Sequence, residues 1–372
     1  MKSSKRSPSG STSPQSTSIK RENSKILNEY LKEEKLNFER LKKEPKLLLL
    51  GSSDSGKSTF LKQLKILHGN GFSEEEFKSA KQCALGNIGY LMETLLPKCQ
   101  GIVELEKYSS DILQYLADDP GPFDAFPLII LKAINMTWNN PDFKAKFSEF
   151  ENDYPPTLPH FLEKINAFGS PSYVVTNDDV LLSRYVTQTI SESIFQINEL
   201  RLHIYDVSGL KYHRKQWLPY FDDVLSIVFI VSSSSYDQLL IEDGKTNRMQ
   251  DALDLFEFIL NHPLLEKPDM ILFFNKKDLF EKKVKKAPIK KYFPDYKGIL
   301  NYFNTLLGRD GSVSEGLEFF QQLFLSKKHE KLGKKFIRVH HTCCTDSQAM
   351  NSIIQTVILS INKNAIYDLG VI

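Results

Sequence analysis

Two glycines, a lysine and a serine form the most informative pattern in this sequence. The apolar run Lys46–Leu50 leads directly into Gly-Ser-Ser-Asp-Ser-Gly-Lys-Ser, residues 51–58, which matches the G-x-x-x-x-G-K-S phosphate-binding loop. Glycines let backbone N–H groups converge on an anion, and the N-terminus of the helix that follows adds partial positive charge. The pattern predicts that Lys57 contacts the β- and γ-phosphates of a nucleotide and that Ser58 ligates Mg²⁺. Taken alone, the motif also fits ATPases and kinases.

Two further motifs narrow the ligand. Asp206-Val207-Ser208-Gly209 follows an apolar strand and matches D-x-x-G, which senses a γ-phosphate. Asn275-Lys276-Lys277-Asp278 follows the apolar strand Ile271–Phe274. The carboxylate of Asp278 can accept hydrogen bonds from N1–H and the exocyclic amine of guanine, a donor pair that adenine does not present. A lone N-K-x-D could be a charged turn, but its place after a strand and in order with the other motifs favours guanine.

Strands that end at one edge of a sheet would bring these motifs together. Apolar runs or period-2 alternation predict strands separated by helical patterns, which indicates an α/β fold with a mostly parallel sheet. In such sheets ligand groups gather at the carboxyl ends of the strands. The predicted strands lie at residues 46–50, 200–206, 224–231, 270–274 and 336–342.

A helical insert separates the first two motifs, because Lys57 and Asp206 lie about 150 residues apart. Segments such as 84–96, 112–116 and 128–138 are apolar without the alternation of strands. The predicted organisation is a disordered Ser- and Lys-rich tail over 1–22, a polar surface helix over 23–45, a nucleotide-binding α/β domain over 46–71 and 177–372, and an all-helical domain over 72–176.

Composition excludes some classes of protein. The 372 residues carry 48 basic and 46 acidic side chains, a balance that argues against a nucleic-acid-binding protein. No apolar stretch approaches the roughly 20 residues that span a bilayer. The four cysteines lack metal-ligand spacing, which fits a reducing, cytosolic compartment. The lysine-rich run 282–291 is interpreted as a solvated surface loop.

Beyond these motifs, the chain resembles the alpha subunits of heterotrimeric G proteins over nearly everything after residue 23. That resemblance implies a Ras-like P-loop GTPase domain with an inserted helical domain. The stretches that carry it are Gly56–Thr59 with Lys62-Gln63 and Lys65-Ile66, Asp179–Leu181 with Ser183-Arg184, Tyr236–Gln238, Glu242-Asp243, Thr246–Met249, Ile271–Phe280 and Thr342–Asp346.

Functional roles follow from the resemblance. Arg184 is similar to the arginine supplied in cis to stabilise charge on the transferred phosphoryl group, and Thr187 is similar to a second Mg²⁺ ligand. Asp206 would hold Mg²⁺ through water, and the Gly209 N–H would meet the γ-phosphate. GTP and GDP are the implied ligands. The expected nucleotide contacts are Gly51, Ser52, Ser53, Asp54, Ser55, Gly56, Lys57, Ser58, Thr59, Asp206, Gly209, Asn275, Lys276, Asp278 and Cys344.

Several residues depart from the family pattern. Leu210 replaces the glutamine whose amide orients the attacking water, so hydrolysis is expected to be slow. Ser53 replaces a glycine next to the γ-phosphate, Asp54 replaces a glutamate, and Gln188-Thr189 replaces a Thr-Gly pair. Another side chain could instead orient the water, or a regulator could supply the amide in trans.

The implied partners are a beta-gamma pair, a seven-helix receptor and an effector that the sequence does not identify. The chain begins Met1-Lys2-Ser3 and has no cysteine before Cys83, so no lipid-anchoring residue is evident. Peripheral association with the inner face of the plasma membrane is therefore expected through partners. Three functions stay open at this point: a signalling GTPase, a scaffold that rests in one nucleotide state, and a P-loop ATPase, against which Asp278 argues.

Overall fold

The computed structural model describes residues 27–28, 31–32, 35, 44–119, 121–184, 189–197, 200–296, 311–332 and 335–367. The tail predicted over 1–22, and Thr187 and Gln188, lie outside these residues. Within the surface helix predicted over 23–45, the five described residues before Glu44 are helical and exposed, as such a helix requires. They are Leu27, Asn28, Leu31, Lys32 and Lys35.

A six-stranded sheet forms the centre of the fold, in the order β2-β3-β1-β4-β5-β6. All neighbouring pairs are parallel except β2 and β3, which are antiparallel, so the predicted mostly parallel α/β fold is confirmed. Strand β2 is not among the strands predicted from the sequence, and its residues are largely exposed. The strands are β1 Lys46–Leu50, β2 Ser191–Ile197, β3 Leu200–Asp206, β4 Val224–Ser232, β5 Asp269–Asn275 and β6 Ile337–His341.

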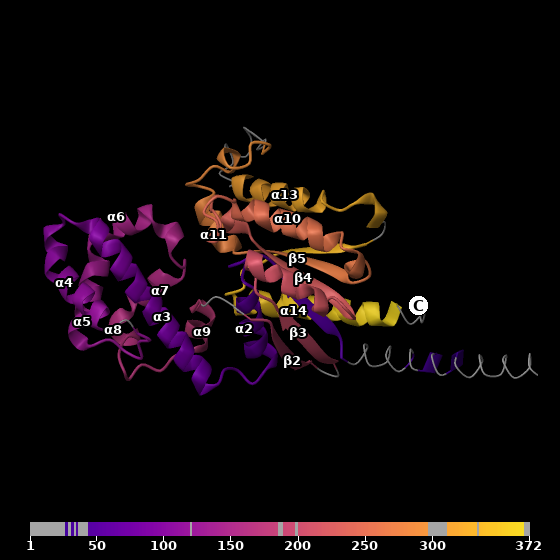
Figure 1. Cartoon of the computed structure of the whole chain (residues 1–372), viewed down its shortest axis with the longest axis horizontal. Helices are drawn as coiled ribbons and strands as arrows, with labels where there is room; N and C mark the ends of the chain where they lie inside the picture. The colour runs from indigo at the N-terminus through magenta and orange to yellow at the C-terminus, as the bar shows by residue number, and fades with distance from the viewer. Residues whose placement is uncertain are drawn as a thin grey trace, which may run out of the picture.

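Helices cover both faces of the sheet (Figure 1). One face packs against α10 (Arg248–Leu260) and α13 (Gly311–Leu325), and the other packs against α2 (Lys57–His68) and α14 (Ser347–Tyr367). Strand β1 supplies Leu48 and Leu50 to the first core and Leu47 and Leu49 to the second. Burial on both faces explains why β1 reads as an unbroken apolar run.

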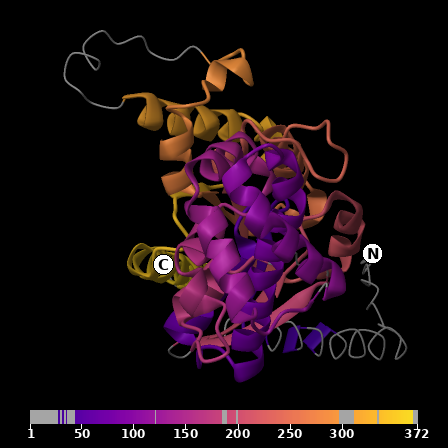
Figure 2. The ribbon, with the colours of Figure 1, turned by 90° about the vertical axis from the view of Figure 1, so that its left-hand side faces the viewer.

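Every regular element that the structure describes between residues 72 and 176 is helical. These helices enclose a separate hydrophobic core and lie to one side of the sheet (Figures 1 and 2). They are α3 Glu74–Leu95, η1 Leu96–Cys99, α4 Val103–Asp118, α5 Leu128–Asn139, α6 Pro141–Glu149, η2 Glu151–Asp153, α7 Leu158–Glu163 and α8 Ile165–Phe168; α9 Asn177–Leu182 leads back toward the sheet.

Polar contacts join the helical part to the sheet part. The Asn152 Oδ1 atom in η2 accepts hydrogen bonds from Gln238 Nε2 at 3.0 Å and from Lys283 Nζ at 2.9 Å. Lys283 ends α11 (Lys277–Lys283) and also pairs with Asp237 at 2.7 Å. The interpretation of 282–291 as a solvated loop is therefore wrong at Lys283, because tertiary contacts bury its side chain to 14% exposure.

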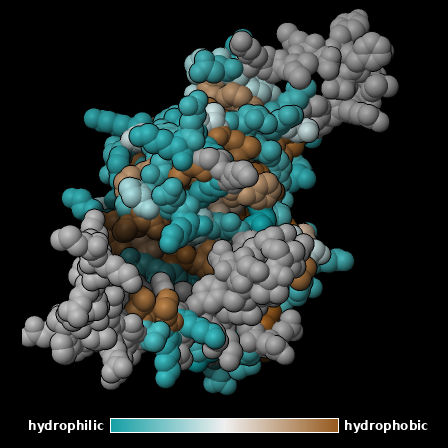
Figure 3. Space-filling model, turned by 90° about the vertical axis from the view of Figure 1, so that its right-hand side faces the viewer, coloured by the Kyte–Doolittle hydropathy of each residue, from teal (hydrophilic) through white to brown (hydrophobic). Residues whose placement is uncertain are grey.

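The face of the molecule turned away from the helical part is mostly hydrophilic, with hydrophobic side chains in several separate areas (Figure 3). Over the residues that the structure describes, no helix is both long and apolar enough to span a bilayer.

Candidate functional site

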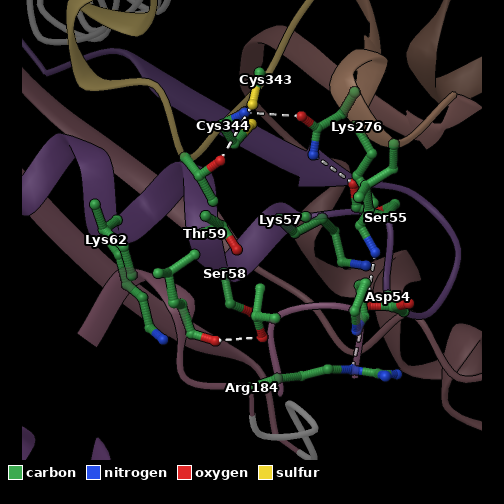
Figure 4. A pocket seen from close by; sticks show the side chains of 18 of the residues that line it. Asp54, Ser55, Lys57, Ser58, Thr59, Lys62, Arg184, Lys276, Cys343 and Cys344 are labelled. Carbon is green, nitrogen blue, oxygen red and sulfur yellow. Dashed lines mark hydrogen bonds and ion pairs between the residues drawn. The ribbon is translucent and has the colours of Figure 1, made fainter. Parts of the chain in front are cut away.

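A cavity of about 360 Å³ opens at the carboxyl ends of β1, β3 and β5 (Figure 4). The loop after β1 turns into α2 at Gly56, whose φ of 106° is left-handed. No side chain caps this helix, so its first N–H groups stay available to an anion. The Lys57 Nζ atom donates to the carbonyls of Gly51 and Ser52, at 2.9 Å each, and lines the cavity. The loop therefore has the geometry of a phosphate cradle.

Ser58 and Asp206 lie together beside this cradle. The Ser58 hydroxyl donates to Asp206 Oδ2 at 3.3 Å, while Asp206 Oδ1 is buried without a hydrogen-bond partner. Burial raises the pKa of the Asp206 carboxyl, and the neighbouring Lys57 charge opposes that rise. A buried carboxylate oxygen without a donor, next to a hydroxyl, fits the oxygen ligands of Mg²⁺.

Gly209 brings the segment after β3 against the cradle. A Cβ atom at Gly209 would lie 2.6 Å from Lys57 Nζ and 2.6 Å from the Ser53 nitrogen, so only glycine fits. Leu210 follows it, lines the cavity and is half-buried. Its side chain carries no polar atom, so it cannot bind a water molecule.

The opposite end of the cavity gathers the segments after β5 and β6. Asn275 Nδ2 donates to the Ser55 carbonyl at 2.8 Å, and Asn275 Oδ1 accepts from the Cys344 N–H at 2.9 Å. Asp278 is exposed and lines the cavity beside the Cys343 thiol, where its carboxylate can meet a base edge. Burial raises the pKa of the Cys344 thiol to about 12, so this side chain stays neutral. One cavity thus joins a phosphate cradle to a candidate guanine contact.

A model of the family described as G-protein alpha subunit matches residues 20–361. This chain belongs to that family. Its relatives include the guanine nucleotide-binding protein alpha-17 subunit of Caenorhabditis elegans, 35% identical over 87% of this chain and 90% of the relative. The alpha-3 subunit of the same organism is 36% identical over 84% of this chain and 87% of the relative. The alpha-9 subunit of Dictyostelium discoideum is 34% identical over 88% and 91%. Members of the family bind GTP and GDP and are GTPases.

Asp54 is the electrostatic centre of this alpha subunit's cavity. Its carboxylate lies 3.2 Å from Arg184 Nε, 3.2 Å from an Arg248 nitrogen and 3.0 Å from Lys276 Nζ. Burial opposes ionisation of the Asp54 carboxyl, but the charges of these three cations outweigh it and hold its pKa well below its usual range. Although it is shorter than the usual glutamate, Asp54 still connects the phosphate loop to all three cations.

Arg184 is held at both ends. Its carbonyl accepts hydrogen bonds from Cys83 Sγ at 2.7 Å and from Asn87 Nδ2 at 3.3 Å, while its side chain reaches Asp54 (Figure 4). The backbone of Arg184 is therefore anchored to α3 in the helical part, and its guanidinium faces the phosphate loop.

Most of the predicted site residues line one cavity, and Gly51, Ser52 and Asp206 lie outside its lining but contact Lys57 or Ser58. Ser52 is buried and its carbonyl accepts from Lys57 Nζ, and Thr59 lines the cavity from the first turn of α2. Thr187 lies outside the described residues. Sequence reasoning missed Arg248, although it lies inside a family-like stretch. Arg248 also donates to the Ser53 carbonyl at 2.8 Å. Gln63 was missed as well; its amide donates to the Cys344 carbonyl at 2.9 Å.

The affinity of this alpha subunit for GDP is expected to fall above pH 8. Burial lowers the pKa of Lys57 to about 8, partly offset by Asp206. A bound phosphate favours the charged amine and raises that pKa, so above pH 8 binding requires proton uptake. The affinity for GDP should not change with pH below pH 7, and it should fall by up to about tenfold per pH unit between pH 8 and 9. Titrations of GDP binding from pH 6.5 to 9 measure this effect.

Lys57→Arg is the matched control for that titration, because a guanidinium keeps its charge over this range. Whatever its affinity below pH 7, this variant should lack the decline above pH 8. An equal decline in both proteins would assign the effect to another group, such as the base.

Gly56→Ala is expected to loosen the site. A Cβ atom at Gly56 would lie 2.1 Å from Asn275 Nδ2, and alanine disfavours a φ of 106°. The substitution must displace Asn275 from the Ser55 carbonyl, so we expect a loss of roughly 2–4 kcal/mol in the free energy of unfolding. Thermal unfolding measures the change. Gly86→Ala, at a helical position with open space, is the control and should unfold within about 1 kcal/mol of the unmodified protein; equal losses would contradict the argument.

Proposed function

We propose that this alpha subunit is a guanine-nucleotide switch that couples a seven-helix receptor to an effector. The observation that carries the proposal is one cavity lined by the phosphate loop, Gly209 and Asp278, with Asp206 hydrogen-bonded to Ser58 at its edge. Because Gly209 lies against the loop that would hold the γ-phosphate, GTP and GDP present different surfaces to the segment that follows it. Binding of the beta-gamma pair and of effectors would depend on that segment.

Different residues of the cavity are proposed to bind the phosphates, to hold Mg²⁺ and to stabilise the transferred phosphoryl group. Lys57 binds the β- and γ-phosphates, and backbone N–H groups of residues 51–56 surround them. Ser58 and Thr187 are the proposed Mg²⁺ ligands, with Asp206 held to the ion through water; the ion, when bound, neutralises charge on the phosphates. Arg184 is the proposed catalytic residue and supplies positive charge to the transferred phosphoryl group.

Base selection is assigned to the segments after β5 and β6. Asp278 accepts from guanine, Lys276 lies along the nucleotide, and Asn275 fixes the Cys344 backbone. This assignment favours a GTPase over an ATPase.

Slow hydrolysis is the feature that sets this alpha subunit apart in the proposal. Leu210 lines the cavity without any group that could orient water. A protein that binds GTP and hydrolyses it slowly would rest in the GTP state. The scaffold function is therefore the second candidate, and Leu210 is the observation that favours it.

We also propose that residues 46–71 and 177–372 form the Ras-like domain and that 72–176 form the inserted helical domain. The separate hydrophobic cores support this division. Membrane association at the inner face of the plasma membrane is proposed to occur through partners, and no nucleic acid is expected to bind.

The nucleotide carried by the purified protein and its effect on partner capture test the proposal. The full chain is loaded with GDP or with a non-hydrolysable GTP analogue and mixed with a beta-gamma pair. Binding of the beta-gamma pair to the GDP-loaded protein, and its release from the analogue-loaded protein, would support the switch. Capture that does not depend on the nucleotide, together with GTP as the purified ligand, would support the scaffold instead. Failure to bind either nucleotide would overturn both.

A further inference from the structure

A second cavity, of about 970 Å³, adjoins the nucleotide cavity. The helical part supplies one wall, which includes Tyr90 and Tyr154. The other wall comes from the segment after β4, which includes Leu239, and from α11 with the residues that follow it, which include Lys286. The two cavities are neighbours with a common wall, because six residues line both. These are Asp54, Pro156, Arg184, Lys276, Leu279 and Lys282.

The wall that the two cavities share borders the middle of the proposed nucleotide, so the inference rests on the proposed function. Asp278 marks the base end of the nucleotide cavity, and Lys57 marks the phosphate end. Leu279 and Lys282 follow Asp278 along α11, and Lys276 precedes it, so the shared wall lies between those ends. The ribose is the part of a nucleotide that joins base to phosphate. A substituent on the ribose hydroxyls would therefore point toward the second cavity.

The second cavity is suited to an anion. Lysine and arginine outnumber aspartate and glutamate in its lining. The Asp54 charge is already shared among three cations, and Asp237 is paired with Lys283. Among the described residues, Lys282 has no ion pair, and the Lys286 Nζ is 4.0 Å from its partner Glu151, both side chains being exposed. Lys98 Nζ lies 3.7 Å from the centre of the Phe150 ring and forms no ion pair with any residue that the structure describes.

We propose that this cavity binds phosphate groups carried on the ribose of a guanine nucleotide. The base and 5′-phosphates would occupy the first cavity, and a 2′- or 3′-phosphate would meet Lys282, Lys286 and Lys98. Lys98 belongs to the helical part and Lys286 to the sheet part, so such a ligand contacts both. It should therefore hold the two parts together more firmly than GDP does.

Competition with labelled GDP on the full chain tests the proposal, with guanosine 5′-diphosphate 3′-diphosphate as the probe. We expect this tetraphosphate to bind at least as tightly as GDP. Lys98→Gln/Lys286→Gln removes two cations that line only the second cavity. The variant should bind the tetraphosphate about tenfold more weakly, because it lacks two cations that would contact the 3′-phosphates. It should bind GDP within about twofold of the unmodified protein.

Lys290→Gln/Lys331→Gln is the matched control, since it removes the same charge at exposed positions outside both cavities. The control should bind both ligands like the unmodified protein. The proposal is overturned if the tetraphosphate binds more than about tenfold more weakly than GDP, or if both double variants lose affinity for the tetraphosphate equally. It is also overturned if tripolyphosphate binds to the GDP-loaded protein and Lys98→Gln/Lys286→Gln weakens that binding, because the site would then bind phosphate that no ribose carries. Absence of GDP binding would instead defeat the proposed function.

Discussion

Replacing Leu210 by glutamine together with Ser53 by glycine is expected to accelerate GTP hydrolysis by about a hundredfold in single turnover. Phosphoryl transfer depends on positioning and on charge stabilisation. Arg184 and Lys57 already supply charge in the cavity, whereas Leu210 offers nothing that could align a water molecule. Glutamine restores an amide at that position, and glycine at 53 removes a side chain from the crowded region beside Gly209. A hundredfold gain corresponds to about 2.7 kcal/mol of transition-state stabilisation.

Two variants separate positioning from other effects. Leu210→Met with Ser53→Gly keeps the volume of the side chain without an amide and should stay within a few fold of the unmodified rate. Adding Arg184→Ala to the glutamine variant should remove most of the gain, because the arginine charge is needed for the step. An unmodified protein as fast as the glutamine variant, or a methionine variant equally fast, would refute the role assigned to position 210.

Asp278→Asn is expected to convert guanine selectivity into xanthine selectivity. The carboxylate accepts from two adjacent donors of guanine, and each lost charge-assisted hydrogen bond costs about 1.5–3 kcal/mol, so GDP affinity should fall by about a thousandfold. An asparagine amide offers one donor and one acceptor, which match the 2-carbonyl and N1–H of xanthine. Competition between labelled GDP and xanthosine diphosphate measures the change.

Glu281→Gln controls for the loss of one negative charge in α11, since Glu281 does not line the cavity. It should leave GDP affinity within about twofold. ADP competing as well as GDP for the unmodified protein would show that Asp278 does not select the base.

The sheet and the phosphate loop could be predicted because their signals are local. An unbroken apolar run such as Lys46–Leu50 indicates a strand buried on both faces, and the glycines after it specify a loop of defined shape. Strand β2 could not be predicted in this way, because most of its side chains are exposed and form no apolar pattern. Its strand conformation depends on its pairing with β3.

The cation cluster on Asp54 depends on contacts between distant parts of the chain. Arg248 is 194 residues from Asp54 and begins a helix whose sequence gives no sign of the phosphate loop. The role of Lys283 also depends on distant contacts. In the sequence it is one of several lysines in a charged run, and only its contacts with Asp237 and Asn152 show that its side chain is buried. Local patterns thus identify the residues that contact a ligand better than those that hold them in place.

Asn275 joins the two ends of the nucleotide cavity, since it donates to the Ser55 carbonyl and accepts from the Cys344 N–H. Ordering either end therefore orders the other. Guanosine and pyrophosphate, added as separate fragments, should then bind with positive cooperativity: each should raise the affinity of the other by the same factor, as thermodynamic linkage requires.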